Sequence, residues 1–120
     1  MNCLDTSVLV EIHLGNPKLI HYQNKPFVIT DLALSEFCGY LLKKHGEKTG
    51  DYWFNKLSSF SYSLSKELLY EAAKFRWKLR HKKMSFVDAA TYLFSQKTHC
   101  TLITTDYDFQ NLPGVEILRK

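Results

Sequence analysis

The chain has 120 residues, of which 45% are hydrophobic and 14% aromatic, and its formal net charge at pH 7 is +4. This length suits one domain with a single core, residues 1–120, and the composition argues against disorder. No apolar stretch approaches the roughly 18–20 residues that cross a bilayer, and the N-terminus lacks the basic and apolar regions of a signal peptide. We therefore expect a cytoplasmic protein without a membrane segment.

Cysteines and histidines do not form a metal-binding pattern in this chain. Cys3, Cys38 and Cys100 are widely spaced among apolar neighbours, which is typical of reduced core thiols. The histidines show no zinc spacing, either with each other or with the cysteines. No serine lies in a nucleophile elbow, and no glycine-rich loop is present to hold a nucleotide phosphate. These observations disfavour zinc enzymes, serine hydrolases and P-loop proteins.

Strand and helix patterns alternate through the first half of the chain. Short apolar runs predict strands, and small polar residues before apolar-periodic segments predict helix N-caps. The predicted elements, in order, are a strand at Asn2–Asp5, a helix from Val8 to about Leu14 capped by Thr6 or Ser7, a short helix from Pro17 to about Gln23, a strand at Phe27–Thr30 and a helix capped by Thr30 or Asp31 that runs to about His45.

The second half continues the alternation. The predicted elements are a helix at Thr49–Leu57, an edge strand at Phe60–Leu64, a long helix beginning near Ser65, a helix from Ser85 to about Lys97, a strand at Thr101–Thr104 and a final strand at Val115–Leu118. Strands separated by helices imply parallel crossover connections and a sheet covered on both faces. The predicted fold class is therefore α/β, with a central parallel sheet.

Four carboxylates stand at or near the carboxyl ends of these apolar runs: Asp5, Glu36, Asp88 and Asp106. In open α/β sheets this edge is where ligands bind. Carboxylates gathered there would repel one another without a cation, and oxygen ligands suit Mg²⁺ or Mn²⁺. The pattern predicts a metal-dependent enzyme that cleaves phosphodiester bonds.

The same motifs resemble those of the PIN domain. They are Leu-Asp-Thr-Ser-Val at the N-terminus, Ser-Glu-Phe after the second strand, Phe-Val-Asp-Ala-Ala opening a late helix, and Leu-Ile-Thr-Thr-Asp-Tyr-Asp-Phe near the C-terminus. Each motif is weak alone, but the four occur in the right order and context. Within this family the chain is similar to the small VapC-type toxin ribonucleases of prokaryotic toxin–antitoxin pairs, and the similarity extends over essentially its whole length.

The resemblance implies a three-layer α/β/α sandwich and RNA hydrolysis that depends on Mg²⁺ or Mn²⁺. It places Asp5, Glu36, Asp88 and Asp106 at the family's catalytic, metal-binding positions. Thr104 matches a hydroxyl residue that supports the site, and Thr6 falls where a polar residue follows the first aspartate. The implied partners are an RNA substrate such as a tRNA or rRNA loop, a cognate antitoxin protein and a second copy of the chain. The segment between Asp5 and Glu36 is shorter than the family pattern, which predicts a trimmed second helix.

Asp5 and Glu36 also have simpler interpretations. Asp5 precedes a helix, and a negative charge there is favoured by the helix dipole by about 0.3–1 kcal/mol. The neighbours of Glu36 on its helix face are apolar, with no basic partner before Lys43. A solvated glutamate usually lies among polar residues, so we expect Glu36 to point into a pocket.

Asp88 and Asp106 have structural alternatives as well. Ser85 and Asp88 have the spacing of a capping box, although the short Asp side chain is expected to reach back poorly. Asp108 competes with Asp106 for the fourth metal position. We favour Asp106 and expect Asp108, a supporting residue, to cap the turn that follows.

One basic run leads toward the Asp88 helix: Lys74, Arg76, Lys78, Arg80, His81, Lys82 and Lys83. Cations at the end of a helix are favoured by its dipole, and this is the simpler interpretation. The alternative is that Arg76, Arg80 and Lys83 contact the RNA backbone, which would make binding salt-dependent and blind to sequence.

Three other classes of protein also place acidic residues at the ends of parallel strands or share this fold. A receiver-like signalling domain needs an acidic pair after its first strand and a phospho-acceptor aspartate after its third, and a haloacid-dehalogenase-type phosphatase needs Asp-x-Asp after its first strand. This chain has neither pattern. The remaining alternative is a catalytically silent PIN fold that serves as an RNA- or protein-binding scaffold, and cleavage of RNA distinguishes the two.

Overall fold

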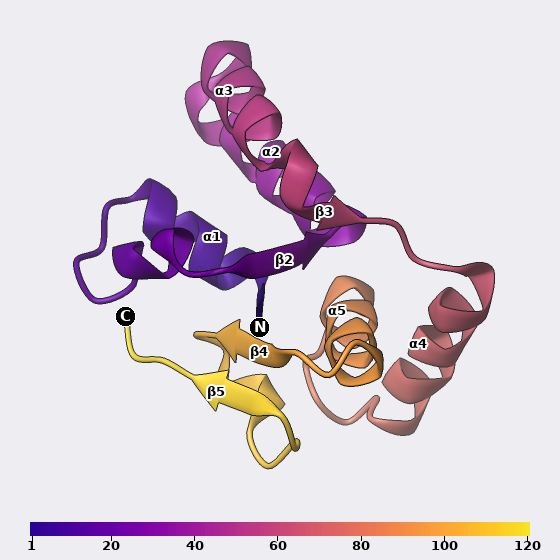
Figure 1. Ribbon diagram of the computed structural model, residues 1–120. Helices are drawn as coiled ribbons and strands as arrows, with labels where there is room; N and C mark the ends of the chain where they lie inside the picture. Colours follow the sequence, from indigo (N-terminus) through magenta and orange to yellow (C-terminus); the bar gives the residue numbers. More distant parts are fainter.

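A five-stranded parallel sheet forms the centre of the molecule in the computed structural model, which describes residues 1–120 (Figure 1). The strands are β1 (Asn2–Leu4), β2 (Phe27–Thr30), β3 (Ser61–Tyr62), β4 (Thr101–Thr104) and β5 (Val115–Ile117). Their order is β3-β2-β1-β4-β5, and every neighbouring pair is parallel. From β1 the chain adds β2 and β3 on one side of the sheet, and it then crosses to the other side of β1 to add β4 and β5. The crevice at the carboxyl ends of β1 and β4 is the switch point where such folds bind ligands.

Helices cover both faces of the sheet. They are α1 (Thr6–His13), α2 (Asp31–His45), α3 (Glu47–Leu57), α4 (Lys66–Lys78) and α5 (Phe86–Lys97), with 3₁₀ turns η1 (Ile20–Asn24), η2 (Ser58–Phe60) and η3 (Tyr107–Phe109). In Figure 1, α2 and α3 lie side by side and project from the β2–β3 side of the sheet, while α4 and α5 lie together on the opposite face. The predicted three-layer α/β/α fold is confirmed. No helix is long and apolar enough to span a membrane.

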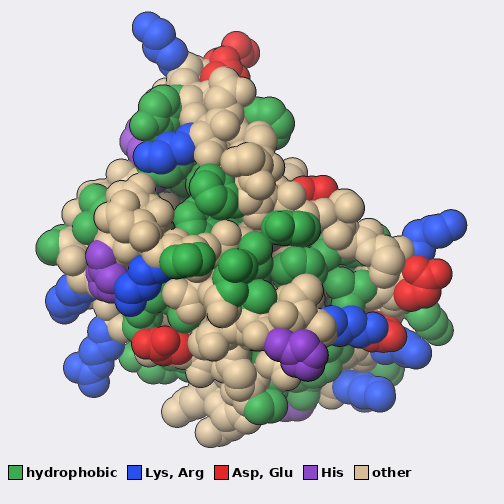
Figure 2. All heavy atoms as spheres, viewed as in Figure 1, with side chains coloured by type: hydrophobic (Ala, Val, Ile, Leu, Met, Phe, Trp, Pro, Cys, Tyr) green, Lys and Arg blue, Asp and Glu red, His purple; other side chains and the backbone are tan.

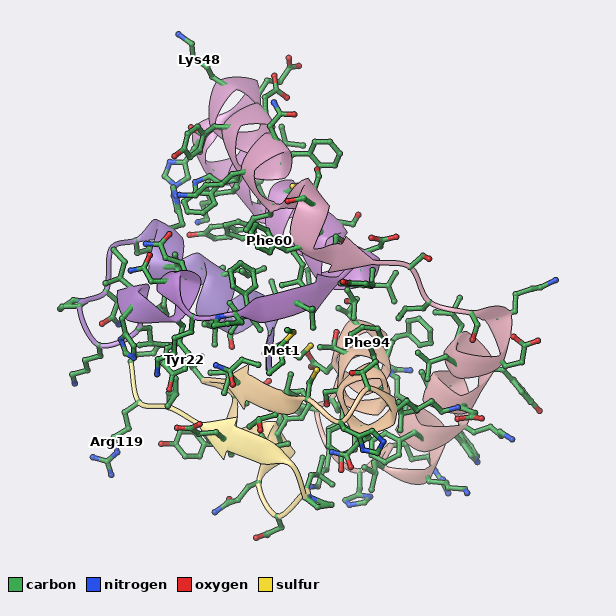
Figure 3. The ribbon with its side chains drawn as sticks, in the orientation of Figure 1. Met1, Tyr22, Lys48, Phe60, Phe94 and Arg119 are labelled. Atoms are coloured by element: carbon green, nitrogen blue, oxygen red, sulfur yellow. The ribbon has the colours of Figure 1, made fainter.

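Alternation along the central strands divides the core in two. Leu4 and Ile103 point to the α1 side, whereas Cys3 and Leu102 point to the α5 side, and all four are fully buried. Figure 3 shows Phe60 and Phe94 on opposite sides of the sheet edge, in keeping with these two layers. Of the three cysteines, which are all free thiols, Cys3 on β1 is buried, and Cys38 and Cys100 are partly exposed.

Most predicted boundaries agree with the structure. Strands β2 and β4 match residue for residue, and α2 begins after its predicted cap, Thr30, whose Oγ1 accepts a hydrogen bond from the Ala33 amide at 3.0 Å. Ser65 and Ser85 likewise cap α4 and α5. The segment before β2 contains a 3₁₀ helix, Ile20–Asn24, in place of the predicted short helix from Pro17 to about Gln23.

The start of α1 differs from the prediction. Thr6 and Ser7 were the expected caps, but both lie inside the helix and its N-cap position is Asp5. The Asp5 side chain makes no capping hydrogen bond. Its carboxylate turns instead toward β4, because it accepts a hydrogen bond from the Thr104 hydroxyl there.

Candidate active site

Asp5 is the most buried carboxylate of the chain, with 2% of its surface exposed. It follows β1 directly, and its Oδ2 accepts hydrogen bonds from Thr104 Oγ1 at 2.8 Å and Ser7 Oγ at 3.0 Å. Its Oδ1 is buried and has no hydrogen-bond partner. The hydroxyl of the next residue, Thr6, is also buried and without a partner. A buried acceptor without a partner is costly, so this oxygen is suited to a ligand.

Two hydroxyl groups join β1 to the end of β4. Thr104 Oγ1 accepts from the Asp106 amide at 3.0 Å while it donates to Asp5. Ser7 Oγ accepts from the Thr105 amide at 3.0 Å in the same way. Of the two predicted supporting hydroxyls, that of Thr104 contacts Asp5, whereas that of Thr6 makes no hydrogen bond. The second hydroxyl in contact with Asp5 is that of Ser7. A serine two residues after an aspartate is a recognisable local hydrogen-bonding pattern, and that spacing was the available signal.

Asp88 forms a complete capping box at the start of α5. Its Oδ2 accepts from the Ser85 amide at 3.0 Å, and Ser85 Oγ accepts from the Asp88 amide at 3.1 Å. The expectation that the short side chain would reach back poorly is thus wrong. Burial, followed by the nearby charge of Asp5 and then that of Asp106, raises the pKa of Asp88 to about 6. Asp88 is therefore both a helix cap and a neighbour of the other two carboxylates.

Asp106 occupies the end of β4 and caps the η3 turn. Its Oδ1 accepts from the Asp108 amide at 2.8 Å. The expectation that Asp108 caps this turn is wrong, because Asp106 does so. The pKa of Asp5 is raised by burial and further by the charge of Asp106, although the hydrogen bonds from Thr104 and Ser7 oppose this shift. The structure thus brings Asp5, Asp88 and Asp106 within electrostatic range of one another.

Glu36 comes from a different element, the first half of α2. It lies exposed on α2, six residues beyond the end of β2, which corresponds to a rise of about 9 Å along the helix. It is not among the charges that act on Asp5 or Asp88. The expectation that Glu36 points into a pocket is wrong, and no three His, Cys, Asp or Glu side chains converge closely enough to form a ready metal cage.

The basic residues lie around the connection between α4 and α5. Arg76 Nε donates to the Met84 carbonyl at 3.3 Å, and Arg80 Nη1 donates to the Trp77 carbonyl at 2.8 Å. Lys83 is exposed. The lysine that reaches the acidic region is Lys82, whose Nζ donates to the carbonyls of Asp108 and Gln110 at 3.5 and 3.4 Å.

The raised pKa of Asp88 predicts how the metal-free protein responds to pH. The pKa in the folded state, about 6, lies above the ordinary value of 3.8, so the folded state retains a proton that the unfolded state releases. Stability from this group is present below pH 3.8 and is lost as pH rises through 6, by up to about 3 kcal/mol before solvent screening.

In chelator, Asp88→Asn should therefore unfold with a higher melting temperature than wild type at pH 7, with the gain vanishing near pH 4. Weaker interaction with the helix dipole would offset about 0.3–1 kcal/mol of this gain. The measurement is thermal unfolding followed by circular dichroism at both pH values. An equal or lower melting temperature for Asp88→Asn at pH 7 would show that Asp88 acts only as a cap.

Comparisons with known proteins identify the family of the chain. The sequence profile described as the PIN domain matches residues 3–115. No curated protein sequence gives a significant match.

Several solved structures share the fold. A toxin–antitoxin complex from Klebsiella pneumoniae aligns with a TM-score of 0.81 at 21% identity, covering 100% of both chains. VapC20 of Mycobacterium tuberculosis, a toxin that cleaves the sarcin–ricin loop, aligns with a TM-score of 0.80 at 20% identity, again covering 100% of both chains. VapBC2 of Rickettsia felis bound to promoter DNA aligns with a TM-score of 0.71 at 15% identity, covering 98% of this chain and 97% of the other. Because the profile match extends over nearly the whole length of the fold, the chain belongs to the PIN domain family.

Proposed function

We propose that the protein is a Mg²⁺- or Mn²⁺-dependent endoribonuclease, the toxin of a type II toxin–antitoxin pair. The observation that carries this proposal is Asp5, a buried carboxylate at the switch point of the sheet. One of its oxygens lacks a partner, and the charges of Asp88 and Asp106 lie nearby. Glu36 is the fourth proposed member and acts from the exposed side of α2.

These residues fit a hard divalent cation. Carboxylate oxygens are the preferred ligands of Mg²⁺. Burial is the main cause of the raised pKa of Asp5 and Asp88, and an ion among the three acidic groups would relieve the charge repulsion that adds to it. Mg²⁺ usually keeps several waters, so a loose set of carboxylates suits it better than a closed cage. Asp5 would hold the ion directly through Oδ1, with Asp88, Asp106 and Glu36 as direct or water-bridged ligands.

The ion, when bound, would neutralise the phosphate oxygens, lower the pKa of a bound water and stabilise the leaving alkoxide. The chain's own residues keep the acids in place for this task. Thr104 and Ser7 hold Asp5 through Oδ2, which leaves Oδ1 free. The capping box fixes Asp88 at the rigid first turn of α5, and the Asp108 amide holds Asp106.

The proposed partners follow from the family and from the apolar surface. VapC20 cleaves the sarcin–ricin loop, and we propose a tRNA or rRNA loop as the substrate here. Figure 2 shows apolar side chains across the middle of one face, with charged groups mainly at its periphery. A cavity of about 660 Å³ at α2 and α3, lined in part by Leu34, Leu42 and Phe54, supports binding of a protein partner, the antitoxin. We also propose that the protein forms a homodimer, as the resemblance to VapC-type toxins implies, and that it is cytoplasmic.

The second candidate function is a silent PIN fold that binds RNA or protein. The exposed position of Glu36 and the lack of a ready metal cage favour it. The buried, unpartnered oxygen of Asp5 argues against a silent scaffold, because such a protein has no need for a free carboxylate oxygen in its interior.

Cleavage of RNA tests the proposal. The purified protein with Mg²⁺ or Mn²⁺ should cut structured RNA and leave 5′-phosphate and 3′-hydroxyl ends, because water rather than the 2′-hydroxyl attacks the phosphate. The measurement is ligation-based mapping of the product ends. Cyclic 2′,3′-phosphate ends would contradict the proposed chemistry, and intact RNA would favour the scaffold.

A further inference from the structure

A cationic pocket of about 240 Å³ lies at the carboxyl end of α4. Its lining residues are Ala73, Arg76, Trp77, Arg80, Lys82 and Met84. All the charged groups in this lining are cations. The one ion pair in the structure joins Lys97 to Glu71, so none of the pocket's cations forms an ion pair with a carboxylate. A concave site with uncompensated positive charge is suited to an anionic ligand.

Trp77 gives the pocket an aromatic surface. It is 64% exposed, unusually open for so large an apolar side chain, although Arg80 covers part of it. The Arg80 guanidinium lies 4.0 Å from the centre of the Trp77 ring, and its Nη1 is held by the Trp77 carbonyl at 2.8 Å. Aromatic rings and arginine planes of this kind are surfaces on which unpaired nucleobases stack.

The pocket is connected to the acidic site by two contacts. Arg76 donates to the carbonyl of Met84, which lies just before the Ser85 cap of α5 and one helical turn before Asp88. Lys82 donates to the carbonyls of Asp108 and Gln110 in the segment that follows Asp106. A ligand bound in the pocket would therefore lie beside the segments that carry Asp88 and Asp106.

Interaction with the dipole of α4 is a simpler explanation for cations near its end. It accounts for the charge of Arg76 and Lys78 in the last turn. It does not account for the exposed ring of Trp77 or for the reach of Lys82 to the next loop. A binding role explains all of these features together.

We propose that this pocket binds one nucleotide of unpaired RNA, with its base against Trp77 and Arg80 and its phosphate near Lys82. The inference rests on the proposed ribonuclease function and deepens it, since the pocket would select single-stranded loops. A base inside a duplex is already stacked on both faces and cannot occupy this surface.

Binding of short RNA to the full chain in chelator tests the pocket without relying on catalysis. The probes are a single-stranded uridine hexamer and an RNA duplex, followed by fluorescence anisotropy and tryptophan emission. The hexamer should bind more tightly than the duplex and quench the emission. Trp77→Phe should keep binding but lose most of the quenching, because Trp53 is then the remaining tryptophan.

Alanine variants measure the stacking and charge contributions. Trp77→Ala should weaken hexamer binding by about five- to a hundredfold, as for the loss of one stacked base. Arg80→Ala and Lys82→Ala should each flatten the salt dependence by up to about 0.7 in log–log slope. The matched control is Tyr70→Ala with Lys74→Ala, an exposed cation–aromatic pair on α4 that lies outside the pocket. Its ammonium is 4.6 Å from the ring centre.

The outcomes separate this inference from the proposed function. If Trp77→Ala binds the hexamer as tightly as the Tyr70 control does, the pocket is not an RNA subsite, whether or not the protein cleaves RNA. Pocket-dependent binding without cleavage in Mg²⁺ or Mn²⁺ would instead overturn the ribonuclease proposal alone. Quenching by a hexaglutamate peptide but not by the hexamer would overturn the RNA assignment in favour of an acidic protein segment.

Discussion

Asp5→Asn is expected to lower the rate of RNA cleavage by about three orders of magnitude. A metal ion contributes several kcal/mol to stabilisation of a phosphoryl transition state, and each 1.36 kcal/mol is a factor of ten in rate. Asparagine keeps the shape of the side chain and removes its negative charge, so the change acts on the metal rather than on packing. The measurement is a single-turnover cleavage rate at saturating enzyme.

The matched control for this variant is Asp51→Asn, an exposed aspartate of α3. It should cleave at the wild-type rate. Circular dichroism should show both variants folded. A folded Asp5→Asn protein that cleaves within tenfold of wild type would remove Asp5 from the catalytic site.

Mn²⁺ is expected to raise the melting temperature of the wild-type protein by about 10 °C. A ligand at one hundred times its dissociation constant stabilises the folded state by about 2.7 kcal/mol, and 1 kcal/mol corresponds to roughly 4 °C for a chain of this size. Asp88→Asn should show a much smaller shift, because it removes one proposed ligand. Thermal unfolding with and without millimolar Mn²⁺ measures the difference.

The same measurement decides between the two aspartates after β4. Asp106→Asn should lose most of the Mn²⁺-induced shift, whereas Asp108→Asn should keep it. The reverse result would move the metal site to Asp108. A full shift in Asp88→Asn, together with full cleavage, would leave Asp88 as a helix cap only.

Local signals in the sequence predict most of this fold. Thr30, Ser65 and Ser85 act as caps because each helix start needs an acceptor for its free amides, and a hydroxyl before an apolar stripe supplies it. Asp5 departs from this rule. Its carboxylate and the Ser7 hydroxyl are both engaged with β4, almost one hundred positions later in the chain, and such contacts leave no local pattern.

Glu36 shows a different limit of sequence analysis. Apolar neighbours on α2 predicted that it would face a pocket, yet it is exposed. The side of α2 that carries Ser35, Cys38 and Leu42 borders the open cavity at α3. Hydrophobicity reports that a surface will be covered, but does not distinguish coverage by the chain itself from coverage by a partner.

The basic run shows why long side chains are hard to assign from sequence. Lys82 and Lys83 are neighbours with the same chemistry, and only the fold directs Lys82 to the carbonyls of Asp108 and Gln110. The acidic residues at strand ends were predictable because parallel strands bring their carboxyl ends to one edge. The charges of Asp5, Asp88 and Asp106 act on one another in the structure, whereas Glu36, the fourth predicted member, is not among the charges that act on Asp5 or Asp88.

Reversible loss of activity in chelator tests the central claim most directly. One preparation of the wild-type protein should cleave RNA in Mg²⁺, stop when the ion is chelated, and recover when Mn²⁺ is added in excess, while its circular dichroism spectrum stays that of the folded protein. Cleavage that continues at the same rate in chelator would show that Asp5, Asp88 and Asp106 do not act through a divalent metal ion.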